Sequence, residues 1–395
     1  MMSRIRLFLP ILFLAAALIP ILWGGGCGPV TRTMPKIPFV EKKAEDFDRL
    51  FSVGGTVTEI HASANWKFLV VLSGGAEKGA RRRLDLFNTE FQTPFPLPEE
   101  ALSDLRRPIC AVFDRKGEEL FVVHAESNGQ THMRRVPLEN KEKEENEPSV
   151  FAEKYAEIIP SPTADWLAVR GETGDWKLID RMEPERIVVF PDGETVKPER
   201  KKFLPPEKTV VVRPLAFSPD GKMVATLAES PDAAPRERKK IVIWDLSVVR
   251  AIALDKAAEL PLSAIYVGEF SVPEMTGDGL CVFSPDGRML ALRHKPKYVA
   301  VYQAAGGRLL SEFGEHKQEI AALAFSPSNT KLAVGTCGEY GRLVLWEVRK
   351  GKILRTLDDP DKQSLGVTAL TFSPDGKLIW YGNNLGDIKE WQTTQ

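Results

Sequence analysis

The stretch Phe217-Ser218-Pro219-Asp220-Gly221 recurs at residues 283–287 and 372–376, and residues 325–329 form a degraded copy. Such recurrence marks the chain as an array of similar units. Strand-like runs rich in β-branched and aromatic residues flank each copy, as at residues 367–372 and 377–381. Proline presets φ for a turn, aspartate suits the next position, and glycine allows positive φ. The motif therefore predicts a hairpin turn between two antiparallel strands.

Two further strands complete each unit. A third run ends in tryptophan at residues 241–245, 343–347 and 387–391, and a fourth apolar run follows it, as at residues 352–357. Four strands in a period of about 40–45 residues are typical of a β-propeller blade. With these turns, Trp244-Asp245 and the near match Trp346-Glu347, residues 50–395 resemble the WD-repeat family.

Earlier units are degraded but can be aligned. The residues that precede the turn in successive units are Ala62, Phe113, Pro160, Phe217, Phe283, Phe325 and Phe372. We therefore predict an all-β, seven-bladed propeller with four antiparallel strands per blade. The alternative is six blades and a separate N-terminal hairpin.

Ring closure is also predicted. The last unit stops after its third strand, and residues 47–53 lie before the first unit. We expect this N-terminal segment to supply the outer strand of the last blade, because a closed ring leaves no exposed sheet edge there.

The resemblance implies a polar lock inside each blade, in which a Gly-His pair and a turn acid bond to Ser/Thr and Trp. One blade approaches this pattern, with Gly314, His316, Thr336, Glu339 and Trp346. The alternative for His316 is a solvated loop residue. Since most blades lack the pattern, we expect apolar packing between blades to hold the ring.

The sequence of the N-terminus is typical of a targeting segment. Arg4 and Arg6 precede an apolar run at residues 7–23, and three glycines then lead to Cys27. This resembles a bacterial lipoprotein signal, which implies lipidation of Cys27, although Gly24 departs from the aliphatic residue preferred there. An uncleaved membrane helix and simple secretion are the alternatives.

We accordingly expect a signal peptide or anchor at residues 1–27, an extended proline-containing tether at 28–46 and the propeller at 47–395. The lipoprotein, the membrane helix and simple secretion all place the propeller outside the cytoplasm, in a bacterial periplasm or envelope. The lipoprotein and the membrane helix also hold it at a membrane.

Composition excludes some partners. The net charge is −1, with 53 basic and 54 acidic residues, so nothing indicates nucleic-acid binding. Beyond Cys27 the chain has Cys110, Cys281 and Cys337. Three thiols cannot all pair within one chain. Cys110 and Cys281 lie in strand patterns, and we expect them to be small buried apolar residues.

Most long insertions and many basic residues map to one predicted face, formed by second-to-third-strand loops and blade-to-blade connections. These residues are Arg81, Arg82, Arg83, Arg200, Lys201, Lys202, Arg236, Arg238, Lys239, Lys240, Arg293, Lys295 and Lys297. They are candidates for docking an acidic partner, either a protein or an anionic component of the envelope, although connecting loops also collect solvated charge.

No motif for catalysis, a metal or a cofactor is present: there is no HExxH, no G-x-S-x-G and no P-loop. We therefore expect a monomeric, non-catalytic interaction scaffold that uses no cofactor. The alternatives are a propeller-type hydrolase and a ligand- or glycan-sensing protein, with the site in the central channel.

Overall fold

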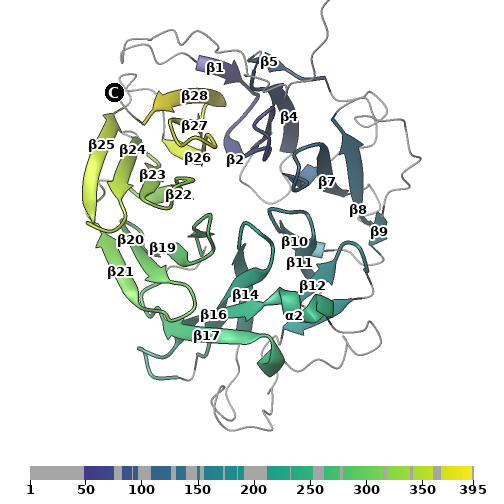
Figure 1. The fold of residues 1–395 in the computed structure, drawn as a ribbon, viewed down its shortest axis with the longest axis vertical. Coiled ribbons are helices and arrows are strands. Elements are labelled where there is room, and N and C mark those ends of the chain that lie inside the picture. The colour runs from purple at the N-terminus through teal and green to yellow at the C-terminus, as the bar shows by residue number, and fades with distance from the viewer. Residues whose placement is uncertain are drawn as a thin grey trace, which may run out of the picture. The chain divides into compact units, whose positions relative to one another are not determined.

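The computed structural model describes residues 49–74, 82–90, 92–96, 108–125, 130–138, 149–151, 155–171, 174–184, 186–190, 211–231, 233–251, 262–275, 279–314, 316, 318–338, 341–358 and 366–393. They form seven four-stranded antiparallel sheets, arranged as the blades of a ring (Figure 1). The predicted seven-bladed propeller is confirmed, and the six-bladed alternative is wrong.

The first three blades follow one another along the chain. Blade 1 contains β2 (Val57–Ala62), β3 (Phe68–Gly74), β4 (Arg82–Asn88) and β5 (Thr93–Pro94). Blade 2 contains β6 (Pro108–Phe113), β7 (Glu119–Ala125), β8 (Thr131–Pro137) and β9 (Ser149–Phe151). Blade 3 contains β10 (Tyr155–Pro160), β11 (Trp166–Gly171), β12 (Trp176–Asp180) and β13 (Ile187–Phe190).

The next three blades repeat the order. Blade 4 contains β14 (Val211–Phe217), β15 (Met223–Glu229), β16 (Lys239–Asp245) and β17 (Tyr266–Ser271). Blade 5 contains β18 (Cys281–Phe283), β19 (Met289–Lys295), β20 (Tyr298–Gln303) and β21 (Leu309–Phe313). Blade 6 contains β22 (Ile320–Phe325), β23 (Lys331–Thr336), β24 (Arg342–Glu347) and β25 (Lys352–Asp358).

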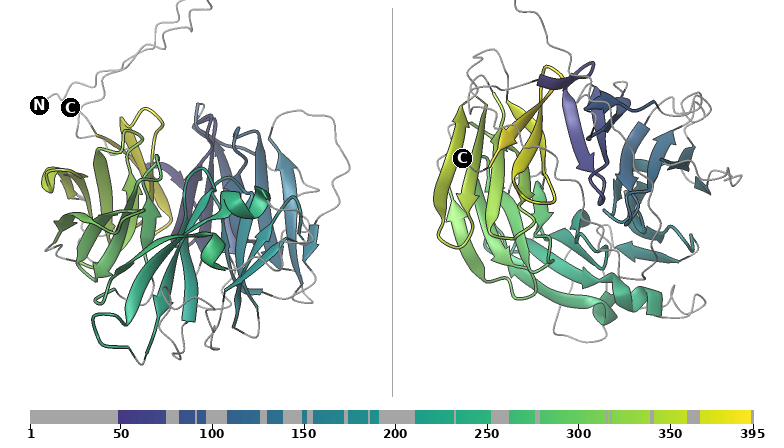
Figure 2. Two further views of the ribbon diagram at one scale, coloured as in Figure 1. Left: turned by 60° about the horizontal axis from the view of Figure 1, so that its bottom comes forward. Right: turned by 45° about the horizontal axis from the view of Figure 1, so that its top comes forward.

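Blade 7 closes the ring with strands from both ends of the propeller. Its strands are β26 (Val367–Phe372), β27 (Leu378–Asn383), β28 (Asp387–Gln392) and the N-terminal β1 (Arg49–Ser52). β1 pairs antiparallel with β28, and Figure 2 shows it beside the strands of the last blade. The predicted closure by the N-terminal segment is confirmed.

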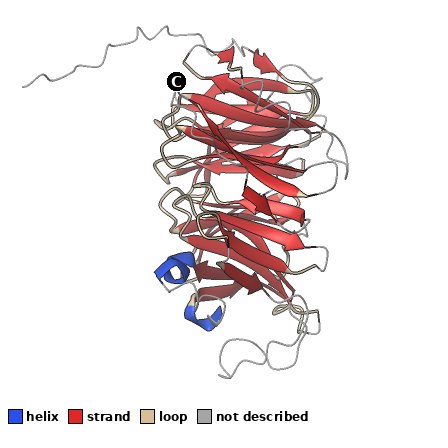
Figure 3. Cartoon of the chain, turned by 90° about the vertical axis from the view of Figure 1, so that its right-hand side faces the viewer, coloured by secondary structure: helices blue, strands red, loops and turns tan. Residues whose placement is uncertain are grey.

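Two short helices interrupt blade 4. α2 (Leu246–Ala251) and the 3-10 helix η1 (Leu262–Ala264) lie between its third and fourth strands. Figure 3 shows both helices on one face of the ring. No helix among the described residues is long and apolar enough to cross a membrane.

Apolar packing holds neighbouring blades together. The buried side chains of the described residues form seven clusters, and each cluster joins two adjacent blades. At the closure, Phe51 of β1 stacks on Phe87 of blade 1 with ring centroids 4.0 Å apart. This confirms the prediction that apolar contacts between blades carry the ring, since burial of apolar surface is the main driving force for folding.

Candidate functional site

The seven aligned turns share one backbone conformation. All seven residues predicted to precede the turn end the innermost strand of their blade. Four positions later each turn has a positive φ, whether or not glycine is present. These residues are Trp66, Gly117, Ala164, Gly221, Gly287, Asn329 and Gly376. The degraded turns therefore keep the geometry of the Ser-Pro-Asp-Gly copies.

Side chains within the turns bond to the turn itself. In blade 4, Ser218 Oγ donates to Asp220 Oδ1 at 2.6 Å and accepts from the Met223 amide at 2.9 Å. Burial alone would raise the pKa of Asp220, but the hydrogen bonds from Ser218 and the Lys222 amide outweigh it, so the pKa lies below its ordinary value. Blade 2 uses Asp114 in place of the serine, and its carboxylate accepts from the Glu119 amide at 2.9 Å.

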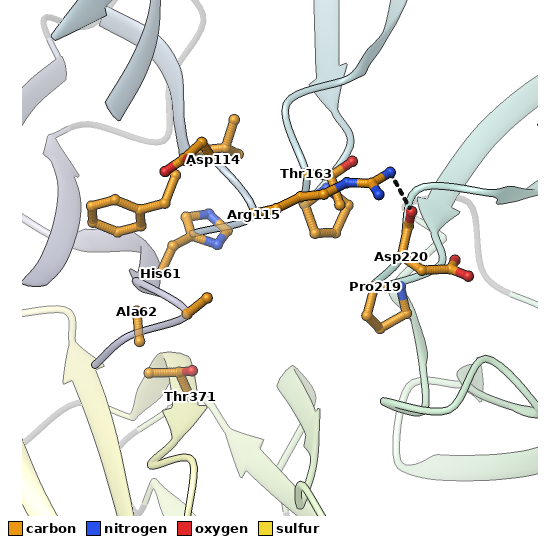
Figure 4. A pocket seen from close by; sticks show the side chains of 12 residues that line it. His61, Ala62, Asp114, Arg115, Thr163, Pro219, Asp220 and Thr371 are labelled. Carbon is orange, nitrogen blue, oxygen red and sulfur yellow. Dashed lines mark hydrogen bonds between the residues drawn. The ribbon is translucent and has the colours of Figure 1, made fainter. Parts of the chain in front are cut away.

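The turns converge on one mouth of the central channel. A pocket of about 400 Å³ opens there, and turns from several blades line it (Figure 4). Its polar side chains include His61, Asp114, Thr163, Asp220 and Thr371. Because the carboxylates of Asp114 and Asp220 are engaged by turn amides, their first role is structural.

Arg115 is one of two residues that replace the turn proline, since five turns have proline at this position and blade 1 has Ala64. Its guanidinium donates to Asp165 Oδ2 of blade 3 at 2.7 Å and to the Asp220 carbonyl oxygen of blade 4 at 3.2 Å. Figure 4 shows the side chain reaching across the mouth toward Asp220. One side chain of blade 2 therefore ties together the next two blades.

Further ion pairs extend from Asp165 over the same face. Arg250 of α2 lies 3.5 Å from Asp165 and donates to both oxygens of Asp180, at 2.8 and 3.0 Å. Asp180 is buried and Asp165 is partly buried, with side-chain exposures of 4% and 14%, whereas Arg115 is 56% exposed. Sequence reasoning missed this network because its members lie in separate blades and share no motif.

The structure describes nine of the thirteen basic candidate residues. Arg81, Arg200, Lys201 and Lys202 lie outside the described residues. Five of the remaining nine have carboxylate partners, in the pairs Arg82–Glu59, Arg83–Asp85, Lys239–Glu229, Lys240–Glu269 and Lys295–Glu274. Much of the predicted basic charge is thereby balanced locally.

The other four differ in exposure. Arg293 is buried and donates to the Ile320 carbonyl oxygen. Arg236, Arg238 and Lys297 are exposed in the second-to-third-strand loops of blades 4 and 5, and no ion pair of theirs occurs among the described residues. These three are the candidates best placed to meet a partner.

Among the described residues, the polar lock that the resemblance implies for blade 6 is incomplete. His316 is only 8% exposed, so the solvated-loop interpretation is wrong. Within the described part of the chain, His316 Nε2 and Trp346 Nε1 have no hydrogen-bond partner, although their rings contact edge to face. Burial lowers the pKa of His316 to about 4. Glu339 lies outside the described residues.

Blade 4 does contain one bond of this kind, in which Trp244 Nε1 donates to Thr226 Oγ1 at 2.8 Å.

Cys110 and Cys281 are buried, as predicted, and burial raises the pKa of both thiols. Cys337 is partly exposed, and none of these three cysteines is in a disulfide. Among the described residues no group of three or more His, Cys, Asp or Glu side chains is placed to hold a metal.

Comparison with known proteins agrees with this geometry. Residues 307–347 match the family model "WD domain, G-beta repeat". The match ends at Trp346-Glu347 and covers the blade in which Gly314, His316 and Thr336 approach the polar-lock pattern. It supports a WD-repeat propeller.

Relatives match over limited segments. Topless-related protein 4 of Arabidopsis thaliana is 30% identical over 118 residues, which are 27% of this chain and 10% of that protein. Eukaryotic translation initiation factor 3 subunit I of Pyricularia oryzae is 30% identical over 97 residues, or 25% of this chain and 27% of that protein. The chain thus spans between a tenth and about a quarter of the length of these relatives.

A solved structure shares the fold over most of the chain. The β-propeller domain of Cps50 (Swd1) from Myceliophteria thermophila superposes with a TM-score of 0.59 at 14% identity, covering 87% of this chain and 98% of that domain. This similarity shows the fold alone.

Proposed function

We propose that this chain is a non-catalytic interaction scaffold, a WD-repeat propeller tethered to a membrane and facing the cell envelope. The proposal rests on the finding that polar side chains at the channel mouth are engaged in hydrogen bonds within the propeller itself. Asp114, Asp220 and Arg115 bond to turn amides or to neighbouring blades. Such side chains make the propeller ring rigid, and a rigid ring that carries connecting loops is suited to presenting a binding surface.

The proposed partner surface lies on the face with the second-to-third-strand loops. Arg236 and Arg238 of blade 4 and Lys297 of blade 5 are exposed there. Exposed cations steer acidic partners and raise association rates, whereas charges already paired contribute little. We therefore propose an acidic protein partner that meets these three residues.

Capture from membranes tests the scaffold role. The full chain carrying a C-terminal tag is purified from detergent-solubilised membranes together with bound proteins. We expect one partner at stoichiometric amount, which is lost in the Arg236→Glu, Arg238→Glu double variant. Arg288→Glu is the matched control, because Arg288 is exposed in the Ser-Pro-Asp-Gly turn of blade 5. Recovery of no partner across several growth conditions would contradict the proposal.

The membrane tether is proposed from the sequence of residues 1–27. The basic start, the apolar run and Cys27 after three glycines support an acylated N-terminus. Intact mass of the membrane-extracted protein tests it. A chain beginning at diacylated or triacylated Cys27 would establish the lipoprotein, a full-length mass would favour a membrane helix, and an unmodified cleaved chain would contradict tethering.

A further inference from the structure

Exposed apolar side chains lie at the start of the outermost strands of blades 5 and 6. Leu309 begins β21 and is 50% exposed, and Ile353 and Leu354 in the first turn-proximal residues of β25 are 47% and 40% exposed. Leu309 pairs with Tyr302, and Ile353 pairs with Trp346, next to a bulge in each blade. The two positions are therefore equivalent in neighbouring blades (Figure 1). A single exposed apolar residue is ordinary, whereas a repeated position indicates a shared contact surface.

Exposed cations accompany these apolar residues. One cation directly precedes the apolar residue of blade 5, and two lie in the turn that leads into β25; they are Arg308, Arg349 and Lys352. Within the parts of the chain that the structure describes, none of the three is in an ion pair, whereas Glu347 of the same turn is paired with Lys350 at 2.9 Å. We call Arg308, Leu309, Arg349, Lys352, Ile353 and Leu354 the outer rim.

The outer rim lies on the face that carries the turns between first and second strands. In blade 5 the Ala304 amide, just after the third strand, donates to the Arg288 carbonyl oxygen of such a turn at 2.9 Å. In blade 6 the Val348 amide donates in the same way to the Thr330 carbonyl oxygen at 2.9 Å. Figure 3 marks this face by α2 and η1, which follow the third strand of blade 4. The partner surface proposed above lies at the opposite ends of the strands.

The first strand of the propeller begins on the same face as the outer rim. β1 takes the place of a fourth strand in blade 7, and its first residue, Arg49, pairs with Lys389 of β28. Because the pairing is antiparallel, β1 starts toward the end of β28, as β21 and β25 start at the ends of their third strands. Arg355 of β25 donates to the Gln392 carbonyl oxygen at the end of β28 at 2.8 Å. The tether proposed at residues 28–46 thus joins the ring at the blade next to the outer rim.

The chemistry of the outer rim fits an anionic membrane surface. Apolar side chains enter the boundary between headgroups and acyl chains, while the long side chains of arginine and lysine reach the phosphates. Each cation near an anionic leaflet strengthens binding about fivefold. Such a contact is weak by itself, but a tether holds the surface at an effective concentration of about a millimolar, which makes a weak contact persistent.

We propose that the outer rim of blades 5 and 6 rests on an anionic lipid bilayer to which the chain is tethered. Its three apolar side chains enter the interface, and its three cations meet lipid phosphates. The loops that carry Arg236, Arg238 and Lys297 then point away from the bilayer, where a protein partner can reach them. This inference rests on the proposed membrane tether and adds an orientation to it.

Amine footprinting tests the proposal with the full membrane-extracted chain. The protein is reconstituted into vesicles of phosphatidylcholine alone or of an equimolar mixture with phosphatidylglycerol. A membrane-impermeant amine reagent is added, and mass spectrometry gives the labelling rate of each lysine. Lys297, exposed on the opposite face, is the internal reference and corrects for chains that face the vesicle lumen.

The labelling rate of Lys352 relative to Lys297 should fall about fivefold or more in the anionic vesicles, because lipid phosphates shield its ammonium group from the reagent. About 0.5 M potassium chloride should reverse much of this protection, since salt screens the contact. An equal ratio in both vesicle types would overturn the proposal. A low ratio in both would mean that another segment, a second copy or another protein covers the rim.

A variant in one blade tests for a surface shared with the next. Leu309→Ser in blade 5 should raise the labelling rate of Lys352 in anionic vesicles about fivefold, because it removes an apolar side chain from the same interface. Leu385→Ser is the matched control, since Leu385 is 51% exposed and lies between the second and third strands of blade 7, on the opposite face. An unchanged rate in Leu309→Ser, or an equal rise in both variants, would overturn the proposal.

The tether and the rim contact fail separately, and vesicle flotation distinguishes them. A chain that floats with both vesicle types but shows the same Lys352 ratio in each keeps the tether and loses the rim contact. A chain that floats only with anionic vesicles, with Lys352 protected, keeps the rim contact and loses the tether.

Discussion

Arg115 of blade 2 donates to Asp165 of blade 3 through its Nη2 at 2.7 Å and through its Nε at 3.2 Å. The same guanidinium reaches the Asp220 carbonyl oxygen of blade 4. Arginine stands here at a position where most of the turns have proline, and its contacts link three blades. The link acts across blade boundaries that are otherwise held by apolar clusters.

Arg115→Ala should lower the free energy of unfolding by about 0.5–1 kcal/mol, because Arg115 is more than half exposed and Asp165 keeps Arg250 nearby. Urea unfolding followed by tryptophan fluorescence measures the change. Lys116→Ala, at the exposed neighbouring position, should have no effect. An equal loss in both variants would show that the inter-blade contact is not responsible.

Arg250→Ala should cost more, about 2–4 kcal/mol, because it leaves the carboxylate of Asp180 buried without its main cation. Asp180 also accepts from the Met182 amide at 2.9 Å. A double-mutant cycle with Asp180→Asn, measured by urea unfolding, should give a coupling of ~1 kcal/mol or more. Strict additivity of the two changes would rule out the pair as a stabilising contact.

His316 predicts a pH dependence of stability. Its pKa of about 4 in the folded protein lies below the ordinary value of 6.5. The unfolded chain therefore binds a proton that the folded chain does not between these values, and stability falls as pH drops from about 6.5 to 4. The loss is on the order of 3 kcal/mol at most.

His316→Gln should flatten that part of the stability curve, measured by chemical unfolding at a series of pH values. His61→Gln serves as the control because the His61 side chain is 44% exposed. A curve with the same slope in the wild type and in His316→Gln would assign the pH dependence to other groups.

Gly221→Ala should destabilise the propeller by about 1–2 kcal/mol, because alanine disfavours the φ of +67° and its methyl group would collide with Thr163 Oγ1. Thermal unfolding gives the measurement. Gly306→Ala is a matched control, since its methyl group would meet Gln303 only at 3.8 Å. A milder effect at Gly221 than at Gly306 would contradict the role of the positive-φ turn.

Phe51→Ala should weaken ring closure. Phe51 is 7% exposed and stacks on Phe87, so its truncation should cost about 3 kcal/mol. Ser52→Ala, at the exposed next residue of β1, should be close to neutral. Denaturant unfolding tests both, and an unchanged midpoint for Phe51→Ala would show that β1 contributes little to closure.

The sequence by itself determined the number of blades, the position of each inner turn and the closing strand. Turn chemistry is local: Ser218 bonds to Asp220 and to the Gly221 amide within a few residues, so the spacing of these residues is visible along the chain. The degraded turns at Trp66 and Ala164 could still be aligned because residues 62–65 keep a serine and a turn-forming asparagine, and residues 160–162 keep the Ser-Pro pair.

Only the tertiary structure decided which charges are available to a partner. Arg83 and Lys240 are paired by Asp85 and Glu269, while Arg115 meets an acid 50 residues away. Coulomb and hydrogen-bond contacts depend on distances between strands and blades, and spacing along the chain does not encode those distances.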